Sequence, residues 1–333
     1  MKKILITGCA GFIGFHLAKK LASEAYHVTG IDNMNSYYDV SLKASRLNLL
    51  KELKNFNFFK KDISTENIFD LSDMGFDVII NLAAQAGVRH SISNPHDYTM
   101  SNLVGFANIL EVARNNKCKL IYASTSSVYG ANENQPFSET KIADHPIQYY
   151  AATKRANEIL AHSYSSMYDL ETLGLRFFTV YGPFGRPDMA LFKFTKNILD
   201  GNPIQVFNNG NHVRDFTYID DIVDGIAACI NYKFKSTLQW DAKNPSPEYS
   251  NAPFRVFNLG NSNPIKLLDY IKYIEEELGI KAIIEFLPLQ TGDVVSTESD
   301  ITLANNELRY SPKINVQEGI RNFIAWYKSY YGY

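Results

Sequence analysis

The sequence predicts an α/β protein built on a doubly wound parallel sheet, with a smaller α/β region after it. Short, almost wholly apolar runs alternate with helical patterns through the first half of the chain. Such alternation is typical of βαβ units whose sheet is covered by helices on both faces. A glycine-rich turn joins the first apolar run to the first helical pattern, which favours a phosphate-binding helix N-terminus.

Six apolar runs are expected to form the strands of this sheet: residues 3–7, 27–31, 56–60, 78–82, 119–124 and 172–177. Helices are expected at residues 12–23, 42–54, 103–115 and 150–168. Prolines divide the chain into short elements after about residue 180. We therefore expect a larger domain at 1–178 and a smaller region at 179–333. Core elements near 211–232 and 255–262 are expected to return to the first sheet, so that the two parts interleave.

Composition excludes several classes of protein. The 333 residues are 45% hydrophobic and 20% charged, with a formal net charge of -2. This balance argues against a nucleic-acid partner, and the lack of an apolar run of about 18 residues argues against a membrane span. The three cysteines, Cys9, Cys118 and Cys229, are scattered along the chain. We interpret them as reduced thiols of a cytoplasmic protein and expect no metal site.

The turn after the first run has the spacing GxxGxxG, with Gly8, Gly11 and Gly14. Gly8 would permit the tight turn, Gly11 would let a pyrophosphate approach the backbone, and Gly14 would let the helix pack closely on the strand. Backbone N–H groups at the helix start, including those of Phe12 and Ile13, would face the phosphates. The pattern predicts a Rossmann-type dinucleotide site in the first domain.

Asp32 follows the second strand, near the distance of about 20 residues at which a carboxylate binds the adenosine ribose. It would repel a 2′-phosphate, and Asn33 follows it where an arginine would favour NADP. The sequence therefore favours NAD. Further cofactor contacts are expected from Asp62, Ile63, Leu82, Ala83 and Ala84, which follow the third and fourth strands.

Tyr150 and Lys154 are four residues apart on an expected helix and so share one face. Tyrosine, with a pKa of roughly 10, is a poor base at neutral pH. A nearby ammonium and the positive nicotinamide ring would lower that pKa. Thr125 ends the fifth strand, at the edge where a parallel sheet presents its ligand crevice. Its hydroxyl could bridge Tyr150 to a substrate.

These motifs, with residues 81–85, 127–130 and 176–183, resemble the extended short-chain dehydrogenase/reductase family over nearly the whole chain. The resemblance implies bound NAD, a nucleotide-diphosphate-sugar substrate, and a catalytic trio of Thr125, Tyr150 and Lys154. It also implies that Tyr150 and Lys154 contact the cofactor. By the same analogy we expect a homodimer formed through the helices at 103–115 and 150–168.

Within this family, the glucuronate 4-epimerase branch is the most similar. Dehydratases of the family carry Asp-Glu after the threonine, and uronate decarboxylases carry a Glu nearby, whereas this chain has Ser126 and Ser127. Serine cannot do that proton chemistry at neutral pH, but it can hydrogen-bond a carboxylate. Residues 185–190, which include Arg186, also resemble this branch, and Thr179 stands where galactose-type epimerases often have Asn.

The resemblance predicts these substrate contacts: Arg89, Ser126, Ser127, Thr179, Arg186, Gln205, Arg214 and Asp293. For Arg214 a structural salt bridge with Asp215 or a neighbour is the alternative, and Arg89 is equally open to a structural role. Thr291 and Val295 replace expected prolines, which leaves the geometry of that loop open.

The expected reaction is 4-epimerisation of UDP-glucuronate to UDP-galacturonate through a transient 4-keto sugar, with Tyr150 as base. The alternatives are a 4-epimerase of UDP-glucose or a UDP-N-acetylhexosamine, and a non-catalytic NAD-binding sensor on the same fold. The aromatic C-terminus, residues 326–333, is compatible with a core, an interface or a loose tail.

Overall fold

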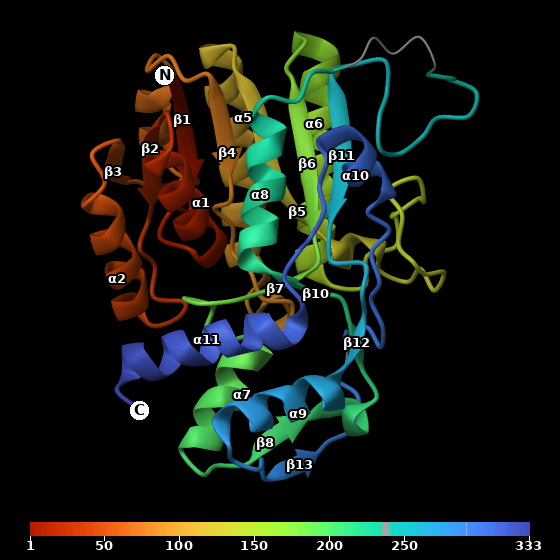
Figure 1. Cartoon of the computed structure of the whole chain (residues 1–333). Coiled ribbons are helices and arrows are strands. Elements are labelled where there is room, and N and C mark those ends of the chain that lie inside the picture. The colour runs from red at the N-terminus through yellow and green to blue at the C-terminus, as the bar shows by residue number, and fades with distance from the viewer. Residues whose placement is uncertain (235–239, 291) are drawn as a thin grey trace.

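The structure is a computed structural model that describes residues 1–234, 240–290 and 292–333. Its centre is a parallel sheet with the strand order β11-β6-β5-β4-β1-β2-β3 (Figure 1). Its strands are β1 (Lys2–Thr7), β2 (Tyr26–Asp32), β3 (Phe56–Lys60), β4 (Val78–Asn81), β5 (Lys119–Thr125), β6 (Thr172–Phe177) and β11 (Phe254–Leu259). The six strands expected from the sequence and the doubly wound fold class are confirmed.

Strand β1 contributes side chains to two hydrophobic cores, because successive residues of a strand point to opposite faces of the sheet. Ile4 and Ile6 pack in a core with α1 (Phe12–Ser23), α2 (Val40–Lys51) and α8 (Ile219–Ile230). Leu5 packs in the other core, with α5 (Gly105–Asn116) and α6 (Tyr149–Tyr168). Cover on both faces explains why the strand sequences are almost wholly apolar.

The second half of the chain returns to this sheet. Strand β11 pairs in parallel with β6, from Phe254 opposite Thr172 to Leu259 opposite Phe177. Helix α8 lies beside α1 on one face (Figure 1). The functional division into residues 1–178 and 179–333 stays a prediction.

The sheet has a switch point between β1 and β4, where the order of the strands along the chain reverses. Crossovers on the two sides of this point leave to opposite faces, and a crevice opens at the carboxyl ends of the strands. The turns after β1, β4 and β5 all lie at this edge, because the three strands are parallel.

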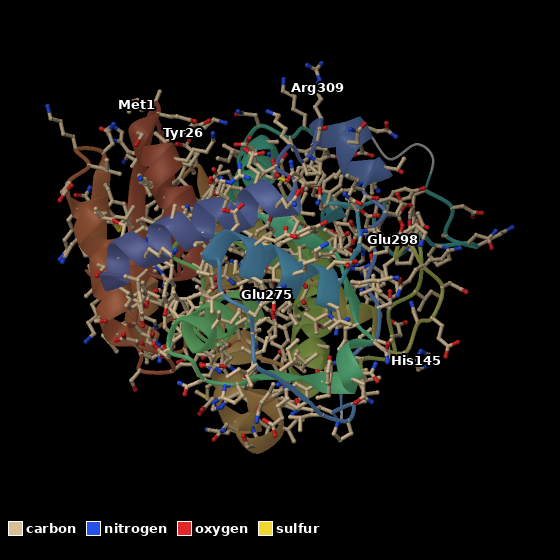
Figure 2. All side chains as sticks on the ribbon, turned by 60° about the horizontal axis from the view of Figure 1, so that its bottom comes forward. Met1, Tyr26, His145, Glu275, Glu298 and Arg309 are labelled. Carbon is tan, nitrogen blue, oxygen red and sulfur yellow. The ribbon has the colours of Figure 1, made fainter. Side chains whose placement is uncertain are left out.

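A second lobe lies below that edge in Figure 1. It contains three two-stranded pairs: β7 (Thr179–Tyr181) with β10 (Phe216–Tyr218), β8 (Ile204–Val206) with β13 (Ile284–Phe286), and β9 (Val213–Arg214) with β12 (Ile265–Lys266). Its helices are α7 (Ala190–Leu199), α9 (Leu267–Leu278) and α11 (Val316–Tyr331). Figure 2 shows α9, where Glu275 is labelled, lying beside α11.

Helices α3 (His90–Ser93), α4 (Pro95–Tyr98) and α10 (Thr302–Leu308) are short. The helix expected at 103–115 begins instead as a π-helical turn over Thr99–Val104 that continues into α5. The helix expected at 42–54 ends at Lys51, because the chain must turn there to enter β3. No helix among the described residues is long and apolar enough to cross a membrane.

The aromatic C-terminus is part of the core on its inner side. Phe323 and Tyr327 of α11 are buried. The ring of Trp326 lies 4.8 Å, centroid to centroid, from Phe184, in the loop after β7. Of the alternatives left open by the sequence, a loose tail is excluded for this helix.

A buried ion pair fixes α6 to the sheet. Arg176 of β6 donates from Nε and Nη2 to the two carboxylate oxygens of Glu158, at 2.9 and 2.8 Å. Ser124 of β5 donates to the same carboxylate at 2.6 Å. Burial alone would raise the pKa of Glu158, but the charge and hydrogen bonds of Arg176 lower it to about 2. The carboxylate is therefore ionised in the folded protein.

Glu139 is a second buried carboxyl group, with 1% of its surface exposed. Its Oε1 accepts a hydrogen bond of 2.6 Å from the backbone N–H of Asn258. Burial raises the pKa of Glu139 from its ordinary 4.5 to about 7. Between pH 4.5 and about 7 the folded protein therefore keeps a proton on Glu139 that the unfolded chain has already released. The free energy of unfolding falls as the pH rises through this range and levels off above it.

We predict that Glu139→Gln removes this decline. The amide oxygen can still accept from Asn258, but the side chain is neutral at every pH. The difference in melting temperature between variant and wild type should grow in favour of the variant from pH 5 to pH 8, measured by thermal unfolding. Glu133→Gln, at an exposed position of the same loop, is the control. Parallel curves for Glu139→Gln and wild type would contradict the prediction.

Candidate active site

All the residues that the sequence predicts to bind cofactor or substrate, or to act in catalysis, line one cleft of about 1380 Å³ at the carboxyl edge of the sheet. Pockets for a single small molecule usually measure about 300–1,000 Å³. This cleft therefore has room for a dinucleotide and a second ligand together. The roles of the individual residues remain predictions.

The glycine turn brings β1, α1 and β4 into close contact. Gly8 has φ of +72°, and a Cβ there would lie 2.8 Å from the backbone nitrogen of Ala83. A Cβ at Gly14 would overlap the carbonyl oxygen of Gly8. Both positions thus require glycine, one for its conformation and one for the approach of the helix to the turn.

The start of α1 fits the pyrophosphate of a dinucleotide. Gly11 is the N-cap, and no side chain caps the helix. The N–H groups of Phe12, Ile13 and Gly14 belong to the first turn, where they have no partner within the helix. These residues line the cleft. Backbone donors and the positive end of the helix dipole suit a phosphate at this place.

Asp32 lies at the end of β2 and joins two turns of the cofactor end. Its carboxylate accepts from the backbone N–H groups of Ala10, at 3.2 Å, and Met34, at 2.8 Å. The Nζ of Lys43 on α2 lies 4.0 Å from it and donates to Asn35 at 2.8 Å. Lys43 lines the cleft, and burial lowers its pKa. Sequence reasoning missed Lys43, because only the packing of α2 brings it to Asp32.

The turn after β3 is held by its own hydrogen bonds. Asp62 accepts from the Nδ2 of Asn33 at 2.9 Å and from the backbone and hydroxyl of Ser64. Burial alone would raise the pKa of Asp62, but these hydrogen bonds hold it below its usual range. The carbonyl of Ile63 accepts from Asn108 at 2.8 Å. Leu82, Ala83 and Ala84 line the cleft from the turn after β4.

Tyr150 and Lys154 face the cleft from α6, beside Thr125 at the end of β5. The Nζ of Lys154 donates to the carbonyl of Ala123 on β5 at 2.9 Å. Burial lowers the pKa of Lys154 to about 8. This lysine therefore places its amino group against the sheet edge, where a cofactor would lie.

The electrostatics of Tyr150 differ from the expectation. Burial raises the pKa of Tyr150. The charge of Arg186 is the first influence that lowers it, and a hydrogen bond with Thr125 is the second. The expected partner, Lys154, is directed to Ala123 instead. The expectation rested on helix spacing alone, which could not show a guanidinium entering from the second lobe.

Arg186 is itself held in place by neighbours. Its Nε donates to the carboxylate of Asp188 at 3.0 Å, and its Nη2 donates to the other oxygen of the same group. The hydroxyl of Tyr37, in the loop before α2, donates to Asp188 at 3.3 Å. The sequence predicted no role for Tyr37 or Asp188, although Asp188 lies in the same motif, residues 185–190, as Arg186.

Several predicted hydroxyl groups line the same cleft as Tyr150. Ser126 and Ser127 begin a 3-10 turn after β5, and the hydroxyl of Thr125 donates to that of Ser127 at 3.3 Å. Thr179 begins β7 and faces the same cleft. The structure thus brings these predicted hydroxyls together at the sheet edge.

Arg89 and Asp293 form a pair across the cleft, with Nη2 and Oδ2 3.0 Å apart. The guanidinium of Arg89 also lies 4.6 Å from the ring centroid of Phe207. Gln205, on β8, lines the cleft near them and donates to Glu285 of β13 at 3.4 Å. The sequence predicted Arg89, Gln205 and Asp293 separately, but it gave no sign that two of them pair.

Arg214 does not form the salt bridge with Asp215 that was its structural alternative. Its Nη1 donates to the carbonyl of Val295 at 2.8 Å, and its Nη2 donates to that of Val294. Asp215 instead accepts from the backbone of Asn261, at 2.8 Å, among others. Arg214 therefore fastens the loop that carries Asp293; Thr291 of that loop lies outside the described residues.

We predict that Gly14→Ala weakens dinucleotide binding, because the added methyl group pushes α1 away from the turn at Gly8. NAD affinity, measured by calorimetry, should fall by at least about tenfold, which corresponds to about 1.4 kcal/mol. Gly75→Ala is the control, since a Cβ there meets open space although φ is +67°. Unchanged affinity in Gly14→Ala would show that the close approach is not needed.

Comparison with known proteins agrees with this geometry. The model of the NAD dependent epimerase/dehydratase family matches residues 4–237. Protein CapI of Staphylococcus aureus is 50% identical over 99% of this chain and 99% of its own length. The probable UDP-glucuronate 4-epimerase of Rhizobium meliloti is 43% identical, over 99% of this chain and 98% of its own.

Among solved structures, UDP-glucuronic acid 4-epimerase of Bacillus cereus, in complex with UDP-glucuronic acid and NAD, superposes with a TM-score of 0.88. It is 35% identical and is matched over 99% of this chain and 100% of its own. The family resemblance found in the sequence is confirmed, with NAD as its cofactor. The chain belongs to the NAD-dependent epimerase/dehydratase family.

Proposed function

We propose that this protein is an isomerase that interconverts UDP-glucuronate and UDP-galacturonate through a transient 4-keto sugar. One observation carries the proposal: Thr125, Ser126, Ser127 and Thr179 line, together with Tyr150, one cleft large enough for a dinucleotide and a nucleotide sugar. Relatives named for UDP-glucuronate 4-epimerisation, of similar length or longer, support the choice of sugar.

In this mechanism Tyr150, as the phenolate, takes the proton from the sugar's 4-hydroxyl, and Thr125 orients or relays that proton. Burial raises the pKa of Tyr150 and the charge of Arg186 opposes that rise, so Arg186 would help to stabilise the phenolate. When bound, NAD supplies a nicotinamide that accepts hydride from the fourth carbon and returns it to the opposite face. Lys154 would bind the cofactor's ribose from the sheet edge.

A 4-keto uronate is a β-keto acid and loses carbon dioxide readily. We assign Ser126, Ser127 and Thr179 to its carboxylate, which they would hold in an orientation that disfavours cleavage of the carbon–carbon bond. A hydroxyl can donate to a carboxylate without exchanging protons with it at neutral pH. Arg186 would also contact the diphosphate of the substrate. Gln205, Arg214 and Asp293 of the second lobe, with Arg89 from the loop after β4, would bind the rest of the uridine diphosphate, while residues 1–178 bind NAD.

A homodimer formed by α5 and α6 is also part of the proposal. Val104, Ile159 and Met167, on or next to these helices, are exposed apolar side chains, and a partner would cover them.

A cytoplasmic location is a further part of the proposal. Cys9, Cys118 and Cys229 are free and buried, which agrees with a cytoplasmic protein.

The proposal is tested by incubating the protein with UDP-glucuronate and NAD and following the products by proton NMR. We expect a mixture of UDP-glucuronate and UDP-galacturonate without UDP-pentose and without accumulation of NADH. Tyr150→Phe should lower turnover by at least about 10²–10⁴-fold, since it removes the base. UDP-pentose would indicate a decarboxylase. No reaction would move the assignment to UDP-glucose or UDP-N-acetylglucosamine, or to a non-catalytic sensor if these also fail.

A separate prediction concerns the carboxylate. Ser127→Ala and Thr179→Ala should slow epimerisation and release UDP-pentose, because a loosely held carboxylate can reach the orientation for decarboxylation. The product ratio is read from the same NMR spectra. Ser138→Ala, which removes a hydroxyl outside the cleft, should leave the ratio unchanged. If both cleft variants keep the wild-type rate and products, the assignment of these hydroxyls is wrong.

A further inference from the structure

Arg46 of α2 is fully buried beside the cofactor end of the cleft, although it does not line the cleft. Its Nη1 donates to the carbonyl of Ala10 at 2.8 Å and to the hydroxyl of Tyr38 at 2.7 Å. Ala10 lies within the glycine turn, between Gly8 and Gly11. One side of the guanidinium therefore holds the backbone that would surround the pyrophosphate.

The other side of the same guanidinium holds the loop that leads to Arg186. Its Nη2 donates to the carbonyl of Phe184 at 2.6 Å and to that of Gly185 at 3.4 Å. Phe184 has φ of +55°, a left-handed conformation that is unfavourable for a bulky residue. Contacts that fix its carbonyl help to keep the loop in this conformation.

The guanidinium of Arg46 is hydrogen-bonded to uncharged oxygens, three backbone carbonyls and one hydroxyl. Within the described part of the chain, no carboxylate lies within 4.0 Å of its nitrogens. Burial of a charge is costly unless the group is paired or hydrogen-bonded. A rigid planar fork that donates in two directions suits a link between two backbone segments better than a single ammonium would.

A second contact joins the same two parts of the molecule. Tyr37, nine residues before Arg46, donates to Asp188, which holds Arg186. The segment from Asp32 to Arg46 thus touches the cofactor end at Ala10 and the substrate loop at both Phe184 and Asp188. A shift of the glycine turn would be transmitted through Arg46 to the residues directly before Arg186.

We propose that Arg46 is a positioning residue that couples the dinucleotide site to the placement of Arg186, so that NAD and the anionic nucleotide sugar strengthen each other's binding. The inference rests on the proposed function for the identity of the two ligands. Because coupling between two sites is reciprocal, UDP must change the affinity for NAD by the same factor as NAD changes the affinity for UDP.

The test measures NAD binding to the purified protein by calorimetry, with and without saturating UDP. We expect UDP to tighten NAD binding to the wild type by about fivefold or more. Arg46→Lys keeps the charge but cannot donate to both loops, so this effect should shrink to within about twofold of none. Tyr37→Phe removes the second contact and should reduce the effect partly; it also serves if Arg46→Lys does not fold.

The control is Arg255→Lys, at a partly buried arginine that pairs with Glu248 and Glu307 outside the cleft. It should lower the melting temperature but keep the effect of UDP. The proposal is overturned if UDP has no effect on the wild type, if Arg46→Lys keeps the effect, or if both lysine variants lose it equally. Binding of UDP does not require turnover, so a wild type that binds both ligands cooperatively but epimerises no sugar would refute the proposed function alone.

Discussion

The arrangement of the active site depends on the buried pair between Glu158 and Arg176. Tyr150, Lys154 and Glu158 follow one another at intervals of four residues, so they lie along one face of α6. Glu158 is bound by Arg176 of β6 and Ser124 of β5. The helix that carries the proposed base is thereby fixed to the two strands whose ends carry Thr125 and lead to Thr179. Loss of one partner of such a pair would leave a buried charge without its counterion, at a cost of about 3–5 kcal/mol.

Two cations line the cleft near Tyr150, and they are held differently. Lys154 is directed to a backbone carbonyl, whereas Arg186, paired with Asp188, opposes the rise in the pKa of Tyr150 that burial causes. A substrate that brings its own negative groups into the cleft would compete with Asp188 for this guanidinium. In the proposed mechanism the protonation state of Tyr150 and the binding of an anionic sugar would therefore be linked through Arg186, and Arg46 holds the loop directly before it.

Much of this could be predicted from the sequence, because the signals were local. Alternating apolar runs gave the strands, and the spacing of the glycines gave the turn before α1. Contacts between distant segments were missed. Lys43 reaches Asp32, Arg89 pairs with Asp293, and Arg46 bridges the turn at Ala10 and the loop at Phe184, the latter 138 residues further along the chain than Arg46. None of these has a pattern in the sequence, since each depends on how a helix or loop packs after the sheet has formed.

The path of the chain explains how two lobes can hold reacting groups in a fixed relation. In the sheet register Thr125 lies opposite Phe177, and Phe177 lies opposite Leu259. Thr179 follows only two residues after Phe177, and β7 pairs with β10, which leads directly into α8 on the sheet. Thr125 thus ends β5 opposite a residue of β6 that lies only two residues before Thr179. In the proposed mechanism a rigid site is needed to keep the 4-keto uronate from losing carbon dioxide, since a carboxylate group that turns freely would reach the orientation for decarboxylation. The return of the second half of the chain to the sheet supplies that rigidity to the proposed mechanism.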